Sequence, residues 1–352
     1  MPQIGLADIM KTDVIAIRNP ARKTTRRLTM FEITIQKLYD VDLDELVKFS
    51  YETLQSSPLR DEYRTVAELE QTFSKMAEDD NEILFLARDS NTREILGKLK
   101  IYTGLPEMAF ISKWDPVVKS CKTKEAIAQS LVKRAKKYTK HKGYNRLEAY
   151  LSPIKEEYEK TRKVYQYLYE REGFHKVTEE ASMRVEMDKW IPPTRVTSLP
   201  EGYAYEEMGK RTEEETLEAF HETFKLGNDR LYLDMSLSQQ RIANKYWFNR
   251  IKPIHPTSLF VIHDDKIVGF SIGHVNDDYI NLGPIGLLPE HRGKGIARAI
   301  LYEGMKRIQD DTDIRYAELE VDVTNSRALK LYTMFGFSEQ YRQEYYAWTL
   351  GK

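Results

Sequence analysis

The sequence predicts an α/β protein with two domains, each built on a mixed sheet with helices on both faces. The 352 residues exceed the usual length of one domain, which is about 100–200 residues. Helix-like and strand-like patterns alternate along the chain, as is typical of sheets covered by helices. Short motifs also recur in the same order in the two halves, which indicates an internal duplication.

A proline-rich break divides the chain near residue 195. Three prolines and a glycine lie from Trp190 to Gly202, and proline continues neither a helix nor a central strand. We therefore predict an N-terminal domain at 30–195 and a C-terminal domain at 196–352. Residues 1–29 carry six Lys or Arg against two Asp. They form either a flexible extension or a segment ahead of a natural start at Met30.

Two pairs of matching segments are the evidence for the duplication. Leu168–Phe174 and Leu331–Phe337 both read L-Y-x-x-x-G-F, and Glu94–Lys100 resembles Asp265–Ser271. Each match is short, but their common order in halves of similar length supports a repeat.

The C-terminal half has a βααβββαβαβ order of elements. Apolar alternation predicts strands, and a 3.6-residue apolar period predicts helices. Asp264-Asp265 marks a hairpin turn, and Gly336 supplies the left-handed residue that commonly follows a helix. The predicted strands cover 203–205, 258–263, 267–274, 279–288, 317–323 and 343–350, and the predicted helices 213–225, 238–250, 295–309 and 326–335.

The strongest chemical signal is a strand–turn–helix segment from Ile285 to Ala299. A helix start leaves backbone amides without partners at the positive end of its dipole, which makes it an anion site. Gly293 and Gly295 let the backbone approach a phosphate closely, and the small side chain of Ala297 leaves room for a ligand at the first helical turn. Basic side chains add charge at Arg292, Lys294 and Arg298. This segment predicts a pyrophosphate site.

Two other phosphate-binding patterns fit this segment less well. A P-loop requires Ser or Thr after the lysine, and Gly295 follows Lys294 here. A dinucleotide fingerprint requires a third glycine where Arg298 stands.

The segment resembles the acyl-CoA-binding motif of the GNAT N-acyltransferase superfamily, R-x-x-G-x-A, at Arg292, Gly295 and Ala297. The later run from Asn325 to Phe337 is similar to that superfamily's second signature, N-x-x-A-x-x-L-Y-x-x-x-G-F. The resemblance is strong over about 150 residues and weaker in the N-terminal half. It implies two tandem GNAT-like domains with mixed, mostly antiparallel sheets, of which the C-terminal one is catalytic.

The resemblance also implies roles for individual residues. The pantetheine arm of CoA would pair with the backbone of Ile285, Gly286, Leu287 and Leu288. The pyrophosphate would lie on the turn formed by Arg292, Gly293, Lys294, Gly295, Ile296, Ala297 and Arg298. Asn325 would bond the pantetheine arm or cap the following helix. Tyr332 would be the general acid for the departing thiolate.

The implied reaction is direct attack of a primary amine on the thioester of acetyl-CoA in a ternary complex. Cys121 is the only cysteine and lies in the other half, so a covalent acyl-enzyme is not expected. The base that accepts the amine's proton is open among several side chains. These candidates are Glu318, Glu320 and Asp322 on one strand face, together with His274 and Asp278. We take Glu320 forward as the predicted base.

The N-terminal half departs from the GNAT pattern at the phosphate turn. No glycine occurs between Gly104 and Gly143, so the matching segment, Trp114–Lys124, lacks the close cradle. We predict a degenerate copy that kept the scaffold and lost CoA binding.

Composition excludes several classes of function. The single cysteine and seven scattered histidines predict no metal site. A net charge of −1 argues against nucleic acid as a partner, although the basic run Lys133–Arg146 leaves open a ribosomal or RNA-bound acceptor. No apolar run spans a bilayer or resembles a signal peptide, which favours a cytoplasmic protein. The acceptor is predicted to be a small-molecule or peptide amine, and the alternative is a non-catalytic CoA-binding sensor or scaffold.

Overall fold

The computed structural model describes residues 13–16, 30–55, 57–60, 62, 65–194, 198–252, 254–276, 278–309 and 313–351. The chain forms two compact units. The first contains the residues up to Lys176 and those from Glu344 onward, and the second runs from Val177 to Gln343. The predicted extension at 1–29 lies outside the described residues except for 13–16, which form a strand.

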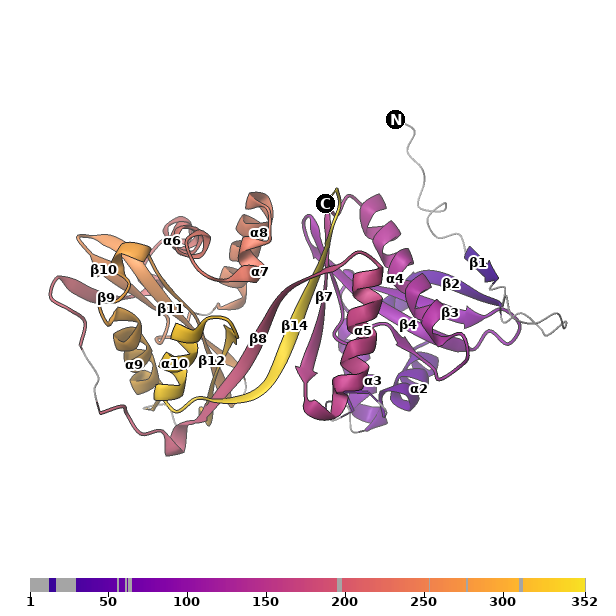
Figure 1. The fold of residues 1–352 in the computed structure, drawn as a ribbon, viewed down its shortest axis with the longest axis horizontal. Helices are drawn as coiled ribbons and strands as arrows, with labels where there is room; N and C mark the ends of the chain where they lie inside the picture. The colour runs from indigo at the N-terminus through magenta and orange to yellow at the C-terminus, as the bar shows by residue number, and fades with distance from the viewer. Residues whose placement is uncertain are drawn as a thin grey trace. The chain divides into compact units, whose positions relative to one another are not determined.

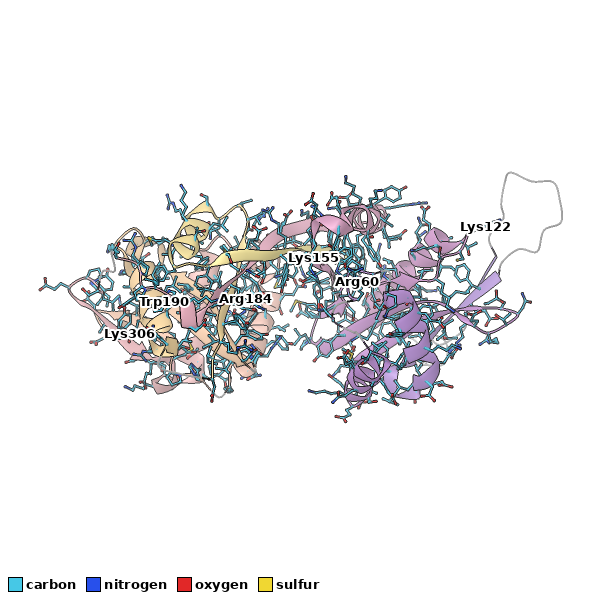
Figure 2. All side chains as sticks on the ribbon, turned by 90° about the horizontal axis from the view of Figure 1, so that it is seen from below. Arg60, Lys122, Lys155, Arg184, Trp190 and Lys306 are labelled. Carbon is cyan, nitrogen blue, oxygen red and sulfur yellow. The ribbon has the colours of Figure 1, made fainter. Side chains whose placement is uncertain are left out.

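This division differs from the predicted boundary near 195, and residues 195–197 themselves are not described. Two long strands, β8 (His175–Glu186) and β14 (Ser338–Thr349), each contribute residues to both units. Most of β8 pairs with a strand of the second unit, and Trp190 after it is buried in that unit's core (Figure 2). Because of this strand pairing, residues 177–190 belong to the C-terminal unit, although they precede the proline-rich break.

The first unit consists of a sheet flanked by helices. Its strand order is β1-β2-β3-β4-β5-β7 followed by the end of β14, with β6 on β4. One buried cluster, which includes Phe85, Leu131 and Tyr169, forms its core. The strands are β1 (Asp13–Ala16), β2 (Met30–Lys37), β3 (Glu82–Asp89), β4 (Ile95–Leu105), β5 (Met108–Ile111), β6 (Val117–Val118) and β7 (Arg146–Ile154), and the α-helices are α2 (Leu43–Leu54), α3 (Val66–Ala77), α4 (Lys124–His141) and α5 (Glu159–Arg171).

The second unit repeats this arrangement with the strand order β14-β8-β13-β12-β11-β10-β9. Helices α9 and α10 lie on one side of β10–β12, and α6 and α8 lie on the other (Figure 1). Its strands are β9 (Tyr203–Glu207), β10 (Leu259–His263), β11 (Lys266–Asn276), β12 (Tyr279–Leu287) and β13 (Tyr316–Asp322), and its α-helices are α6 (Glu213–Lys225), α7 (Arg230–Leu233), α8 (Leu237–Arg250), α9 (Ile296–Gln309) and α10 (Ser326–Met334).

The local sequence signals explain most of these elements. Asp264 and Asp265 both have positive φ, 49° and 59°, as a two-residue hairpin turn between β10 and β11 requires. Helices α6 and α8 begin with capping boxes at Thr212 and Ser236. The short helix α7 was not predicted, and β14 begins five residues before the predicted 343.

The repeated L-Y-x-x-x-G-F motif has the same conformation in both units. Gly173 and Gly336 have φ of 81° and 88° and end α5 and α10. In each case the amide of the following phenylalanine donates to the carbonyl of the motif's tyrosine, at 2.9 Å in the first unit and 3.1 Å in the second. The matching geometry supports the predicted duplication.

Candidate functional site

The candidate site lies where two parallel strands of the second unit separate. β12 and β13 pair only at Tyr279–Asn281 with Tyr316–Glu318. Beyond this point the backbone of β12 pairs on one edge with β11 and leaves its other edge open. A cavity of roughly 680 Å³ occupies this wedge, lined by β12, β13, the first turns of α9 and α10, and the α6–α7 loop.

The β12 backbone forms one wall of the cavity at Gly283–Leu287. Gly286 allows the strand to pack closely against α6, because a Cβ there would lie 2.4 Å from Cγ2 of Thr223. Leu288, predicted to belong to this wall, is outside the cavity lining. Its amide donates to the carbonyl of Val268 at 2.9 Å and is therefore used by the sheet.

The second wall is the turn before α9 together with the first turn of that helix, residues 292–298, here called the helix mouth. Gly293 and Gly295 have φ of 79° and 85°, a region that residues with a Cβ adopt only with strain. The first amides of a helix have no intrahelical acceptor, and those of Gly295, Ile296 and Ala297 find none elsewhere among the described residues. These amides border the cavity and can receive an anion.

The three basic residues of this turn have different roles. Arg292 donates to the carbonyls of Leu287 and Leu226, at 2.9 and 2.8 Å, so it braces the turn against the end of α6. Lys294 lies outside the cavity lining, since its ammonium donates to the hydroxyl of Tyr203 at 3.1 Å. Arg298 lines the cavity, and its buried Nε has no hydrogen-bond partner in the described part of the chain. Arg298 is thus the basic side chain best placed for a phosphate.

Asn325 occupies the N-cap of α10. Its Oδ1 accepts from the amide of Ala328 at 3.3 Å, and the residue also lines the cavity. The capping role is therefore present, and the side-chain NH₂ remains available to a ligand.

Replacing Asn325 separates its two roles. Asn325→Ala is expected to lose about 1 kcal/mol of stability because the cap disappears, whereas Asn325→Ser keeps a capping oxygen. If the NH₂ group holds the pantetheine arm, both variants bind CoA several-fold more weakly. Thermal denaturation and CoA titration of both variants measure the two effects. Wild-type CoA affinity in Asn325→Ser would leave Asn325 as a cap alone.

Tyr332 lies on α10 and lines the cavity with 8% of its surface exposed. Its hydroxyl has no hydrogen-bond partner among the described residues, and burial raises the pKa of Tyr332 to about 12. The phenol is therefore protonated at neutral pH and can donate a proton or a hydrogen bond into the cavity.

The predicted base candidates differ in their surroundings. Glu320 lines the cavity and is partly open to solvent, while desolvation by the surrounding protein and the nearby Glu318 carboxylate raise the pKa of Glu320. Glu318 forms an ion pair with Arg184. Burial opposes ionisation of Asp322, but hydrogen bonds from Arg230 and its neighbours outweigh this effect and lower the pKa of Asp322 to about 2.

Two further candidates do not line the cavity. Asp278 lies 3.5 Å from Arg315 at the surface, and burial lowers the pKa of His274. A cavity carboxylate that the sequence analysis missed is Glu180 on β8. Burial, Asp229 and Glu320 raise its pKa to about 8.

The corresponding wedge of the first unit is filled by protein. β5 and β7 pair only at Met108–Phe110 with Arg146–Glu148, as β12 and β13 do. The buried Trp114 follows β5, and Tyr165 donates to the carbonyls of Trp114 and Pro116 at 2.7 and 2.9 Å. Tyr169, which corresponds to Tyr332, donates to the carbonyl of Asp115 at 2.5 Å. These contacts use the backbone groups that a ligand would need, in agreement with a degenerate copy.

The basic run on α4 makes contacts within the first unit. Lys136 donates to the carbonyl of Glu172 and lies 5.1 Å from the ring centre of Trp348, and Lys133 is 3.8 Å from the carboxylate of Glu172. Part of the predicted polyanion surface therefore has a structural role.

No group of three His, Cys, Asp or Glu side chains suited to a metal occurs among the described residues. Within the same residues, no helix combines the length and apolar character needed to cross a membrane.

The splayed strands, the glycine-lined helix mouth and the cavity between them are the features that the resemblance to the GNAT superfamily predicts. The model of the Acetyltransferase (GNAT) family matches residues 217–337, so this segment of the C-terminal unit is a GNAT domain. No curated protein is significantly similar to the chain in sequence.

Solved structures are similar to nearly the whole chain. A GCN5-related N-acetyltransferase from Sphaerobacter thermophilus aligns with a TM-score of 0.60 at 17% identity, over 91% of this chain and 95% of that one. A tandem GNAT protein from the clavulanic acid biosynthesis pathway aligns with a TM-score of 0.55 at 13% identity, over 92% and 99%. At these identities the likeness establishes the fold, two tandem GNAT-like units.

Proposed function

We propose that the C-terminal unit transfers an acetyl group from acetyl-CoA to a primary amine by direct attack within a ternary complex. The observation that carries the proposal is the wedge between β12 and β13, which joins an open strand edge to a helix mouth with free amides. A pyrophosphate on the amides of Gly295, Ile296 and Ala297 would direct the pantetheine arm along Gly283–Leu287. The thioester would then lie near Tyr332 and Glu320, which line the same cavity.

The residues of the cavity match the steps of aminolysis. The ammonium of the acceptor loses a proton to Glu320, directly or through water, and a raised pKa makes this carboxylate a stronger base. The amine nitrogen attacks the thioester carbonyl, whose oxygen is stabilised by a β12 amide. The nitrogen becomes positively charged on attack and loses its second proton to solvent as the C–S bond breaks and the amide product forms. The CoA thiolate takes a proton from Tyr332. Glu320 and Tyr332 are both restored when the proton held by Glu320 passes through solvent to the Tyr332 phenolate.

Binding stoichiometry and turnover test this proposal together. We expect calorimetry to give one acetyl-CoA per chain, because Trp114, Tyr165 and Tyr169 fill the wedge of the first unit. We expect thiol release from acetyl-CoA to depend on added amine. Two bound CoA molecules per chain would contradict the degenerate copy. CoA binding without turnover on any amine would instead identify a sensor, and no binding would reject the proposal.

A further inference from the structure

The cavity of the second unit has oppositely charged ends. Three arginines line it on the α9 and α10 side, at Arg292, Arg298 and Arg327. Four carboxylates line it where β8, β13 and the start of α7 meet, at Glu180, Asp229, Glu320 and Asp322. The arginine side suits the diphosphate of CoA, so the opposite side is left for the second substrate.

Strand register places the carboxylates on one face. Glu180 on β8 lies directly opposite Asp322 on β13, and paired residues of antiparallel strands project to the same side. Glu320 lies two residues before Asp322 and shares that side. Gln343 donates to Glu180 at 3.2 Å, a contact that supplies no positive charge.

Only one of the four carboxylates is neutralised by the described part of the protein. Arg230 donates to both oxygens of Asp322, at 2.6 and 3.0 Å. Asp229 accepts the capping hydrogen bond of α7 from the amide of Tyr232, and burial raises its pKa. Within the described residues, Glu180, Asp229 and Glu320 form no ion pair; we call these three the carboxylate end.

The electrostatic surroundings of the carboxylate end agree with a missing cation. Burial is the largest cause of the raised pKa of Glu180, and the carboxylates of Asp229, Glu320 and Asp322 raise it further. Arg230 faces Glu180 but is held by Asp322. Arg250 lowers the pKa of Glu320 without pairing with it. Like charges gathered in a cavity favour a positively charged ligand.

An independent feature also indicates a ligand in this cavity. Tyr332 is more than nine-tenths buried, yet its hydroxyl has no partner among the described residues. The hydroxyl opens onto the cavity, so a bound molecule can supply the hydrogen-bond partner that the protein does not. The equivalent Tyr169 of the first unit satisfies its hydroxyl with a backbone carbonyl. The polar atoms of the second unit's cavity are therefore arranged for a bound molecule.

We propose that the carboxylate end is the acceptor subsite and that the acceptor is a polycationic amine, such as a diamine or polyamine. This inference rests on the proposed function. The reacting ammonium gives its proton to Glu320, so a monoamine would leave Glu180 and Asp229 with no cation during the reaction. A second ammonium, held by Glu180 and Asp229, keeps the site compensated while Glu320 serves the reacting nitrogen.

The test uses pairs of acceptors that differ only in charge. An aminoalkyl-trimethylammonium with three to five methylenes is compared with its carbon isostere, which carries a tert-butyl group in place of the trimethylammonium. Both kcat/KM and the Kd for binding to the CoA-saturated protein are measured. We expect the cationic member to be preferred by about tenfold or more, as for a charged partner in a partly buried site.

Two isosteric variants link this preference to the carboxylate end. Glu180→Gln and Asp229→Asn keep the contact from Gln343 and the α7 cap, respectively, while each removes a charge. We expect each to reduce the cationic preference several-fold. Glu179→Gln is the matched control, since Glu179 lies on the other strand face and pairs with Arg342 at 3.0 Å. The CoA affinity of all three variants is measured as a check that they are folded.

The outcomes separate this inference from the proposed function. Turnover with equal kcat/KM for the cationic and neutral acceptors overturns the inference and leaves the transferase standing. Cation-selective binding that Glu180→Gln removes, without turnover on any amine, supports a cation site at the carboxylate end and rejects the transferase, and with it the role of acceptor subsite. A preference that Glu179→Gln reduces as much as Glu180→Gln overturns the inference, because general surface charge would then explain it.

Discussion

Gly295→Val is expected to raise the Kd for CoA by about a hundredfold or more. Gly295 has a φ of 85°, and a β-branched residue at such an angle costs on the order of 1–2 kcal/mol. The helix mouth would relax to relieve this strain and withdraw amides from the pyrophosphate. Each charge-assisted hydrogen bond is worth about 1.5–3 kcal/mol, and about 1.4 kcal/mol corresponds to a factor of ten. Calorimetric titration with CoA measures the change.

Gly143→Val provides the matched control for this variant. Gly143 follows α4 in the first unit with a φ of 86°, and a Cβ added there would have no neighbouring atom within 4 Å. The backbone strain is therefore similar, but no predicted ligand contact is lost. We expect comparable losses of melting temperature and a CoA affinity close to wild type in the control. Equal CoA affinities in the two variants would contradict the role of the helix mouth.

The sequence predicts those parts of the site that are encoded over a few neighbouring residues. The turn at Asp264-Asp265, the helix-ending Gly336 and the glycine-lined start of α9 each depend on local backbone preferences, and the structure has all three. The resemblance to the GNAT superfamily rested on the same short motifs, and the family match over 217–337 confirms it.

Features that depend on strand pairing could not be predicted in this way. Alternation along 175–186 indicates a strand but does not say which partner it pairs with. β8 pairs with β13, and this pairing brings Glu180 into the cavity of the C-terminal unit. One signal was present: the duplicated L-Y-x-x-x-G-F motif is followed by a strand in both halves, β8 after α5 and β14 after α10, so those two strands are equivalent in the repeat.

The motif also could not predict the side-chain contacts of individual residues. Lys294 and Leu288 match the GNAT positions, yet Tyr203 and the β11 backbone take up their polar groups. Likewise, the missing glycines predicted that the first unit is degenerate, but not that Tyr165 and Tyr169 would fill its wedge. A motif fixes the backbone course, whereas the partner of each polar atom depends on the packed tertiary structure.

Tyr332→Phe is expected to lower kcat about a hundredfold and to leave the Kd for CoA nearly unchanged. General acid catalysis contributes about 10²–10⁴-fold, and a thiolate, with a thiol pKa near 8.5 in the case of cysteine, needs less help than an alkoxide. Phenylalanine keeps the ring packed against Phe337, whose centre is 6.1 Å away, so the helix should be preserved. Steady-state kinetics and CoA titration of the same preparation separate the two effects.

The pH dependence gives an independent check on this acid. Tyr332 acts in its protonated form, and burial raises its pKa from 10.0 to about 12. The rate of the wild type should therefore not decline between about pH 8 and 10 through loss of this proton. A decline with an apparent pKa near 10 that disappears in Tyr332→Phe would show that the phenol is solvated, contrary to its position in the structure.

Tyr169→Phe is the control that tells catalysis from packing. Tyr169 holds the same motif position in the first unit, and its hydroxyl donates to the carbonyl of Asp115 at 2.5 Å. Removing that hydroxyl leaves a buried carbonyl without its partner, which costs about 1–3 kcal/mol. The two variants should thus behave in opposite ways: Tyr169→Phe loses stability and keeps kcat, and Tyr332→Phe loses kcat and keeps stability. If Tyr332→Phe were destabilised with an unchanged kcat, Tyr332 would be a packing residue, and the thiolate would leave without a protein acid.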